Sequence, residues 1–570
     1  MSGKGIKLII PLTLLSIGVW AQPDRLVRDS TGGQSGGNPS AGYGNYVPIL
    51  PTDREPDIIR KAASVVPSPR QLRWQQLELT AFFHFGINTF TDKEWGNGKE
   101  DITLFNPTQL DARQWVRIAK ESGIRQVILT AKHHDGFCLW PSRYTEHSVQ
   151  HTPWKNGKGD VVKEVSEACR EYGIGFGIYL SPWDRNSPLY GDSIKYNAYF
   201  ENQLTELLSN YGRIDEVWFD GANGEGPNGK KQVYDFAAWY RLIRRLQPTA
   251  TIAIMGPDVR WVGTESGQGR LTEWSVLPVD GQMQEKIAAG SQKDITFAPK
   301  GDLTGDDLGA RAKIMSAKAL IWYPAETDVS IRPGWFYHQS EDGKVKTPDQ
   351  LKDIYFSSVG RNGVLLLNIP PDKDGLISAS DSISLEGWGK KIAGIFAVNL
   401  VKGAALRCAN GLHTGALVEG VDGGTGRDGV ESGSGGADAG RGGGENGAGR
   451  GGGGEGDDKD GDGRDIGDGK PYFTTRGKDT ATTIYIAWKE AKTFDVLLLR
   501  ENVRIGQRIE QFVLEYKDGD SWRKITEGTT VGYKRLLRFP PVTAARLRLK
   551  IESSRSNPTL AELGLYKQPD

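Results

Sequence analysis

Residues 216–224 read EVWFDGANG, an apolar run that ends directly in Asp220 and a glycine. The same kind of ending recurs upstream, where other apolar runs lead into ionisable or aromatic residues. These runs and their endings are Ala81–Phe83 with His84, Val127–Lys132 with His133 and His134, and Ile174–Ile178 with Tyr179. A parallel α/β barrel builds its functional site from the C-terminal ends of its strands. The pattern therefore predicts such a barrel, with these polar ends meeting at one face.

Helix-like segments separate these strands between residues 70 and 256. Apolar residues recur at helical spacing, and Gly or Pro follows, in four segments: 111–122, 160–172, 196–211 and 234–246. Repeated strand–helix units of this kind favour a parallel sheet closed as a (β/α)8-like TIM barrel. An open, doubly wound sheet is the competing α/β arrangement, but no phosphate-binding glycine fingerprint follows the first strand.

The second half of the barrel is less regular, and a different pattern begins after it. We interpret Val364–Asn368 as the final barrel strand and Glu386–Ala397 as the closing helix. After residue 400, short and mostly alternating runs separated by turns indicate a β-sandwich; they cover 482–486, 494–499, 512–516 and 547–551. The expected domains are therefore a catalytic barrel over 66–400 and a C-terminal sandwich over 401–570.

Residues 417–470 interrupt the sandwich with a segment made mostly of Gly, with Asp, Glu, Arg and Ser. Such a composition cannot bury enough apolar surface to fold, so we expect a disordered insertion. Within it, Asp458, Asp460, Asp462 and Gly463 match the first half of a calcium-binding loop. Gly469 stands where the closing Glu of that loop should be, which favours a solvated acidic tract over a calcium site.

The first 21 residues have the features of a secretory signal peptide. Lys4 and Lys7 precede the apolar run Leu8–Trp20, and Ala21 is a small residue at the cleavage position. No cysteine follows that could carry a lipid anchor. Residues 22–65, rich in Gly, Ser, Pro and Asn over most of their length, are expected to form a flexible lead-in. The mature protein is accordingly expected to be secreted or periplasmic.

The overall composition excludes several classes of partner. The 71 basic and 71 acidic residues cancel, so nothing indicates electrostatic capture of nucleic acid or an anionic membrane. No stretch reaches the roughly 18 apolar residues of a membrane span. The three cysteines, Cys138, Cys169 and Cys408, are too few for a disulfide framework, and we expect them to be free and buried. The 16 Trp and 19 Tyr suit sugar faces, although a large core also uses aromatics.

Asp220 and the two adjacent histidines are the first candidates for chemistry. A carboxylate at a strand end can be a nucleophile, a general base, a metal ligand or the partner of a structural Arg. The other polar strand ends favour a functional role for Asp220. His133 and His134 are interpreted as hydrogen-bond partners of sugar hydroxyls. A metal site or purely structural histidines are the alternatives, and the helical spacing of a zinc protease is absent.

Hydrolysis of a glycosidic bond requires a second carboxyl group that stays protonated near neutral pH. The candidates on a later strand-end loop are Asp258, Glu265 and Glu273. Glu265 lies among glycines near Trp261, in a loop that can partly desolvate it, and desolvation raises the pKa of a carboxyl group. Spacing alone leaves the choice between Glu265 and Glu273 open.

A series of ordered motifs makes the chain recognisable between about residues 66 and 400. They are FHFGINTF (83–90), EWG (94–96), KHHDGF (132–137), YLSPWD (179–184), VWFDG (217–221), SIRPGWF (330–336) and the segment from GRNG to Asn368 (360–368). In these motifs the chain resembles the retaining α-L-fucosidases of glycoside hydrolase family 29.

The resemblance implies roles for individual residues. Asp220 would be the nucleophile that forms a covalent fucosyl-enzyme. The segment Asp258–Glu265 looks like that of the branch specialised for α-1,3 and α-1,4 linkages, with Glu265 as acid/base, although that branch usually has Asn in place of Thr264. Seven side chains would line the fucose pocket: His84, Glu94, Trp95, His133, His134, Tyr179 and Trp335. The sandwich looks like a discoidin-type, galactose-binding-like module, and the resemblance implies no metal or organic cofactor.

Taken together, the sequence predicts an exported, retaining exo-α-L-fucosidase. Its substrate would be terminal α-1,3- or α-1,4-linked fucose on an oligosaccharide or glycoconjugate. One alternative is a catalytically inactive glycan-binding protein in which the sandwich recognises the ligand. The other is a related barrel glycosidase with another sugar specificity. The presence of both Asp220 and Glu265 argues against the inactive protein.

Overall fold

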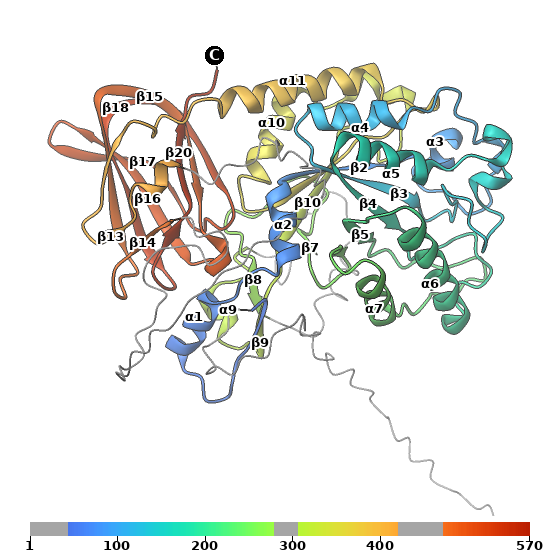
Figure 1. Ribbon diagram of the computed structural model, residues 1–570, viewed down its shortest axis with the longest axis horizontal. Coiled ribbons are helices and arrows are strands. Elements are labelled where there is room, and N and C mark those ends of the chain that lie inside the picture. Colours follow the sequence, from blue (N-terminus) through green and yellow to red (C-terminus); the bar gives the residue numbers. More distant parts are fainter. Residues whose placement is uncertain (1–43, 279–305, 420–470, 570) are drawn as a thin grey trace, which may run out of the picture. The chain divides into compact units, whose positions relative to one another are not determined.

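Eight parallel strands form the central sheet of the residues that the structure describes, 44–278, 306–419 and 471–569, and helices pack against it (Figure 1). In this computed structural model the strands follow the order β6-β5-β4-β3-β2-β11-β10-β7, and each hydrogen-bonded pair is parallel. The end strands β6 and β7 also contact each other, so the sheet is nearly closed. This is the (β/α)8-like barrel that the sequence predicts.

The barrel strands are short and almost fully buried. They are β2 (Leu79–Phe83), β3 (Gln126–Lys132), β4 (Gly175–Leu180), β5 (Glu216–Phe219), β6 (Thr251–Ile254), β7 (Arg260–Trp261), β10 (Ala325–Ser330) and β11 (Val364–Asn368). Parallel strands covered on both faces need apolar residues at consecutive positions. This explains why β3, β5 and β11 contain the continuous apolar runs Val127–Leu129, Val217–Phe219 and Val364–Leu367.

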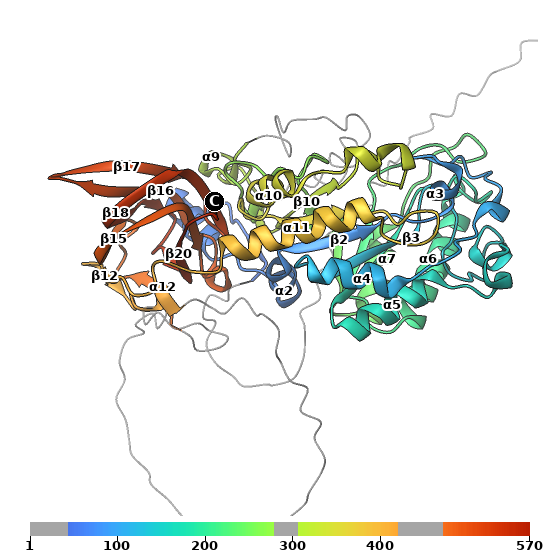
Figure 2. The same cartoon turned by 90° about the horizontal axis from the view of Figure 1, so that it is seen from above.

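Aspartates begin four successive barrel helices. The helices of the barrel are α2 (Pro69–Leu77), α3 (Ile87–Thr91), α4 (Ala112–Glu121), α5 (Val161–Tyr172), α6 (Ser193–Asn210), α7 (Phe236–Leu246), α10 (Pro348–Ser357) and α11 (Ala379–Ile395). At the start of α4 to α7, an Asp side chain accepts a hydrogen bond from a backbone N–H of the first turn. α4 packs beside both α5 and α11 (Figure 2).

The last strand and the last helix of the barrel form as the sequence predicts, except that the helix begins earlier than expected. β11 lies between β2 and β10, as expected for the last strand of a barrel. The helix after it, α11, begins at Ala379, before the expected start at Glu386. The reason is Ser378, whose hydroxyl caps the helix by accepting from Asp381 N.

The expected flexible lead-in over 22–65 is wrong for its second part. Residues 22–43 lie outside the described residues, but β1 (Tyr46–Pro48) pairs with β9 (Ala319–Trp322), and α1 (Glu55–Ala63) follows. Ile58 and Ala62 of α1 are buried in a small core with residues of β8 (Val276–Pro278), β9 and α9 (Arg311–Ile314). A composition-based interpretation missed this helix because its apolar face is narrow and its partners lie far along the chain.

The C-terminal part forms two antiparallel sheets around a second core, as the sandwich prediction requires. The larger sheet contains β12 (Ala405–Arg407), β15 (Thr482–Arg500), β16 (Ile509–Asp518), β17 (Ser521–Gly528), β18 (Arg535–Ser554) and β20 (Glu562–Tyr566); the smaller contains β13 (Gly411–Leu412), β14 (Phe473–Thr475) and β19 (Thr559–Leu560). β15 and β18 are much longer than expected because register shifts let one strand bend and continue.

The predicted insertion, 417–470, lies mostly outside the described residues. Its first residues belong to α12 (Ala416–Glu419), and Leu417 is buried in the core of the sandwich. The described structure therefore continues slightly past the expected boundary. The calcium alternative at Asp458, Asp460 and Asp462 falls on residues 420–470, outside the described residues.

A buried ion cluster joins the sandwich to the start of the barrel. Glu78, next to β2, pairs with Arg500 (2.7 Å) and with Lys534 (2.5 Å). Burial would raise the pKa of Glu78, but the charges of Lys534 and Arg500 lower it to about 2. The barrel's core cluster also includes apolar side chains of the sandwich: Val496, Leu498, Leu536 and Tyr566. The two modules therefore share one buried interface.

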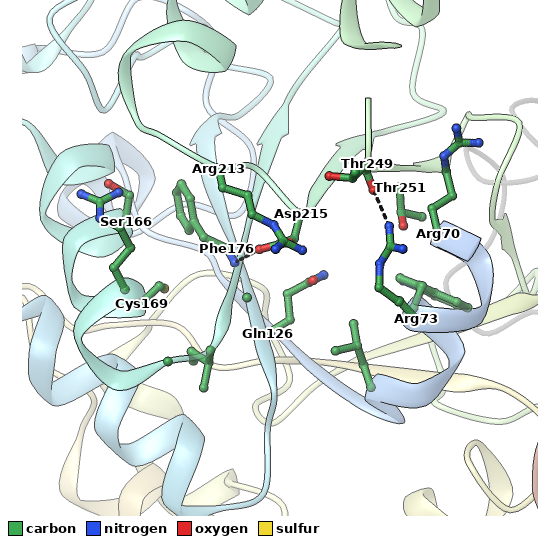
Figure 3. Close-up of a pocket in the computed structure, with 16 residues that line it drawn as sticks. Arg70, Arg73, Gln126, Ser166, Cys169, Phe176, Arg213, Asp215, Thr249 and Thr251 are labelled. Carbon is green, nitrogen blue, oxygen red and sulfur yellow. Dashed lines mark hydrogen bonds and ion pairs between the residues drawn. The ribbon is translucent and has the colours of Figure 1, made fainter. Parts of the chain in front are cut away.

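A cavity of about 390 Å³ lies at the end of the barrel where the strands begin (Figure 3). Its lining includes the first residues of β3, β4 and β6, which are Gln126, Gly175 and Thr251. Asp215 in its wall pairs with Arg213 (2.6 Å) and accepts from the backbone N of Phe176 (3.1 Å). Polar groups at this end of a barrel serve stability, so we place the candidate site at the other end.

No helix within the described residues combines the length and the apolar character needed to cross a bilayer. All three cysteines are free thiols, as expected. Cys138 and Cys169 are buried, whereas Cys408 is only partly buried, which corrects the expectation that all three would be buried.

Candidate active site

Side chains from four neighbouring strands meet where those strands end. His84 follows β2, His133 and His134 follow β3, Tyr179 lies near the end of β4, and Asp220 follows β5. The ring centroids of His133 and His134 are 4.2 Å apart, and those of His84 and Tyr179 are 6.1 Å apart. The structure thus brings together the strand-end residues that the sequence singles out, at the C-terminal face of the barrel.

Both carboxylate oxygens of Asp220 receive hydrogen bonds. The hydroxyl of Tyr179 donates to Oδ2 (3.2 Å), and the backbone N–H of Ala222 donates to Oδ1 (2.5 Å). Burial raises the pKa of Asp220, and the Ala222 N–H, the charge of His133 and the Tyr179 hydroxyl oppose this rise. The two hydrogen bonds fix the direction of the carboxylate. The side chain is 25% exposed, so a ligand can still reach it.

Two of the histidines are oriented by uncharged partners. Nδ1 of His84 lies 2.8 Å from Oδ1 of Asn368, and Nδ1 of His134 lies 2.8 Å from Oγ of Ser181. Burial lowers the pKa of His84 and of His134 well below the usual value. At neutral pH both are therefore neutral imidazoles, which can exchange hydrogen bonds with hydroxyl groups. Nε2 of His134 lies 3.8 Å from Oδ2 of Asp220.

Glu265 lies in the loop between β7 and β8 and is partly buried. The indole N–H of Trp335 donates to its Oε2 (3.3 Å). Burial and the nearby negative charge of Asp220 raise the pKa of Glu265 to about 7, with the Trp335 hydrogen bond opposing the rise. Asp220 and Glu265 are thus two interacting carboxyl groups, and one of them can keep its proton near neutral pH.

Glu94 is anchored by three donors. Its Oε2 accepts from Trp335 N (2.8 Å), and its Oε1 accepts from Phe336 N (3.1 Å) and from Nε2 of His338 (2.7 Å). The other ring nitrogen of His338 lies 2.7 Å from Oδ1 of Asp92. Burial would lower the pKa of His338, but its bonds to Asp92 and Glu94 raise it. The imidazole of His338, held between the carboxylates of Asp92 and Glu94, therefore fixes Glu94.

Two indole rings flank the histidines. Trp95 is 54% exposed, and its ring packs edge-on against His134 (5.5 Å between centroids) and Trp183 (5.6 Å). Trp335 lies deeper, with its ring centroid 5.2 Å from that of His84. The site thus combines polar groups with flat apolar surfaces, the combination that sugar binding requires.

The other two candidates for the second carboxyl are bound in ion pairs away from Asp220. Asp258 is buried and pairs with Arg244. Glu273 pairs with Arg260 and with Arg270 (3.2 Å), and all three side chains are at most 1% exposed. Burial would raise the pKa of Glu273, but the charges of Arg260 and Arg270 lower it. A carboxyl held in this way is poorly suited to act as an acid near neutral pH, which favours Glu265 over Glu273 as the candidate.

Several residues of this region were missed in the sequence. Asn368 ends β11 and carried the same strand-end signal as Asp220. Ser181 and Trp183 lie just past the end of β4, close to Tyr179. His338 had no local signal, since the carboxylate that it contacts is 244 residues away. Among the described residues, no group of three or more His, Cys, Asp or Glu side chains could hold a metal ion.

Comparisons with known proteins agree with this geometry. The family model described as alpha-L-fucosidase matches residues 64–393. Alpha-L-fucosidase 1 of Arabidopsis thaliana is 42% identical over 513 residues, which is 88% of this chain and 87% of that protein.

Solved structures extend the comparison. A Bacteroides ovatus protein superposes with a TM-score of 0.74 at 44% identity and covers 93% of this chain and 78% of its own. A Ruminococcus gnavus GH29 fucosidase in complex with fucose superposes with a TM-score of 0.69 at 28% identity, over 92% of this chain and 99% of that chain.

The family match covers the barrel, and the strand-end cluster lies inside it. The Arabidopsis thaliana and Bacteroides ovatus matches cover 88% and 93% of this chain, so they extend into the sandwich as well. The chain therefore belongs to the α-L-fucosidase family, glycoside hydrolase family 29.

Proposed function

We propose that this glycoside hydrolase is a retaining exo-α-L-fucosidase with Asp220 as nucleophile and Glu265 as acid/base. The observation that carries the proposal is the pair itself. Asp220 is held by two donors and partly exposed, whereas the pKa of Glu265 is raised to about 7 by burial and by Asp220. A retaining glycosidase needs one ionised carboxyl and one protonated carboxyl facing the same sugar.

The reaction would proceed in two displacements. The Asp220 carboxylate attacks C1 of fucose, while Glu265 gives its proton to the departing glycosidic oxygen. A covalent fucosyl-enzyme results, and Glu265 is left ionised. Glu265 then takes a proton from water, the water oxygen attacks C1, and the bond to Asp220 breaks. Fucose leaves with its original anomeric configuration, and both carboxyl groups return to their starting states.

The surrounding side chains suit a 6-deoxy sugar. Fucose presents three hydroxyl groups besides the anomeric centre, and His84, His133, His134, Glu94 and Tyr179 can meet them with donors and acceptors. Its methyl group and apolar ring face need flat apolar surface, which Trp95 and Trp335 supply. Glu94 already accepts three hydrogen bonds, so it is held rigidly for a fourth from the sugar.

We also propose a preference for α-1,3 and α-1,4 linkages, based on the resemblance of the segment Asp258–Glu265. Thr264 takes the place of the usual Asn in that segment. Its hydroxyl lies 2.6 Å from the hydroxyl of Ser266, so the two residues flanking Glu265 are joined to each other. A hydrogen bond between the two residues that flank Glu265 is thus present with threonine at position 264.

A linkage-defined panel would test this function. We expect the protein to release fucose from a nitrophenyl α-fucoside and from Lewis-type trisaccharides, at least about tenfold faster than from a matched α-1,2-linked fucoside. The first anomer seen by NMR should be α-fucose. A β-anomer would contradict the retaining mechanism, and a preference for the α-1,2 linkage would contradict the specificity. Binding without release from every substrate would favour the inactive glycan-binding alternative.

Export to the periplasm or the medium is a further proposal. It is supported by the basic start with Lys4 and Lys7, the apolar run Leu8–Trp20 and the small residue Ala21. N-terminal sequencing of protein expressed with its own leader should find Gln22 first. Recovery of the full-length chain from the cytoplasm alone would contradict export.

A further inference from the structure

Buried ion pairs join the two ends of the segment that carries Glu265. Arg260 lies at its start, and Glu273 and Arg270 lie at its end. Glu273 pairs with both arginines, and none of the three is more than 1% exposed. On the barrel side, Val262 N donates to the carbonyl of Glu326 (2.8 Å). The two ends of this segment, residues 260–273, are therefore tied to each other.

The outer side of this segment is held by the sandwich. The hydroxyl of Thr530 accepts from Glu273 N (3.1 Å), and the side chain of Arg535 donates to the carbonyl of Leu271 (2.7 Å). The amide of Gln507 donates to the carbonyl of Glu273 (3.0 Å) and accepts from Ser275 N (2.7 Å).

These contacts are suited to positioning a backbone. Thr530, Gln507 and Arg535 are at most 5% exposed, so each bond is made away from water, where an unpaired backbone group is costly. Their partners are backbone atoms of residues 271–275, so the contacts fix the course of the chain. A displacement of about 1 Å of a catalytic group can cost about 100-fold in rate.

We propose that the C-terminal sandwich is a positioning element of the active site, which holds the loop of Glu265 in place through Gln507, Thr530 and Arg535. The inference rests on the proposed acid/base role of Glu265. It gives the sandwich a task in the reaction without any contact between the sandwich and the sugar. The three side chains are positioning residues, since they act through the backbone that leads to Glu265.

Thr530→Val is the sharpest test, because it keeps the shape of the side chain and removes the acceptor for Glu273 N. Thr559→Val is the matched control: Thr559 is a buried threonine of the same module, and its hydroxyl has no hydrogen-bond partner among the described residues. Each variant would be assayed on two substrates. A fucosyl disaccharide needs the acid to expel its leaving group, whereas a dinitrophenyl α-fucoside does not.

We expect Thr530→Val to lower kcat/KM for the disaccharide by about tenfold or more and for the dinitrophenyl fucoside by less than about threefold. Thr559→Val should leave both values nearly unchanged. An equal loss on both substrates would indicate a merely structural role and overturn the proposal. Unchanged kcat/KM on both would overturn it as well.

Amide hydrogen exchange separates this proposal from the function on which it rests. The peptide containing Glu273 should exchange faster in Thr530→Val than in Thr559→Val, because its buried N–H loses an acceptor. Equal exchange would show that the sandwich does not hold the loop. If the parent protein releases no fucose from either substrate, the proposed function fails, and the exchange comparison still decides whether the sandwich holds this segment.

Discussion

Replacement of Asp220 by Ala is expected to reduce turnover by roughly 10⁵-fold or more, because no other group could form the covalent intermediate. Folding should be spared, since Asp220 accepts only two hydrogen bonds and is partly exposed. Azide should restore part of the activity by entering the space of the missing carboxylate. It would attack C1 from that side and give β-fucosyl azide, with inverted configuration.

The stereochemistry of the azide product is the decisive measurement. Tyr179→Phe is a suitable comparison, since it removes one hydrogen bond to Asp220 and keeps the carboxylate. It should lower kcat without any rescue by azide. Wild-type turnover by Asp220→Ala, or an α-azide from it, would refute the assignment of Asp220 as nucleophile.

Replacement of Glu265 by Ala is expected to have the second largest effect, and its size should depend on the leaving group. Loss of a general acid costs about 10²–10⁴-fold. The kcat/KM for a Lewis-type trisaccharide should fall by that amount, whereas that for a dinitrophenyl fucoside should change little. Azide should accelerate the second step by attacking the fucosyl-enzyme, and the product should be α-fucosyl azide, opposite to that of Asp220→Ala.

The same carboxyl should set the alkaline limit of activity. Glu265 must carry a proton to act as an acid, and its pKa is raised to about 7. The kcat/KM for an unactivated fucoside should therefore fall as the pH rises through about 7. Glu265→Gln should abolish this fall of kcat/KM on the alkaline side of the pH profile. The acidic limb should remain in that variant, because it reports protonation of Asp220.

Glu273→Gln is the control for both experiments with Glu265. It removes the charge that Arg260 and Arg270 share, and breaking a buried pair of this kind costs about 3–5 kcal/mol of stability. The variant should unfold at lower temperature and, because Glu265 keeps its carboxyl group, should form much less α-fucosyl azide than Glu265→Ala. Formation of α-fucosyl azide by Glu273→Gln, and not by Glu265→Ala, would refute the acid/base assignment.

Much of the fold was predictable because the signals are local. The run from Val217 to Phe219 is apolar since β5 is covered on both faces, and Asp220 ends it since the strand opens onto the site. N-caps such as Asp160 and stops such as Gly173 mark helix ends within a few residues. The sequence around α1 gives weaker local signals for a helix, and the burial of α1 depends on β8 and β9, which lie far along the chain.

The candidate site was predictable only in part for the same reason. Strand ends are visible in one sequence, so His84, Tyr179 and Asp220 could be found. The choice between Glu265 and Glu273 depends on which of them two arginines contact, and neither spacing nor composition carries that information. The part of His338 in holding Glu94 was hidden as well, since it depends on two segments that meet only in the folded chain.

The ion cluster at Glu78 limits how this enzyme could be recombined with its relatives. In a chimera with a foreign sandwich, Glu78 would still be covered, and it would need cations at the positions of Arg500 and Lys534. Without them, the buried ion pairs of Glu78 would be broken, at a cost of about 3–5 kcal/mol, a large share of the 5–15 kcal/mol free energy of unfolding typical of a folded protein. Barrel and sandwich are therefore exchangeable only as a matched pair.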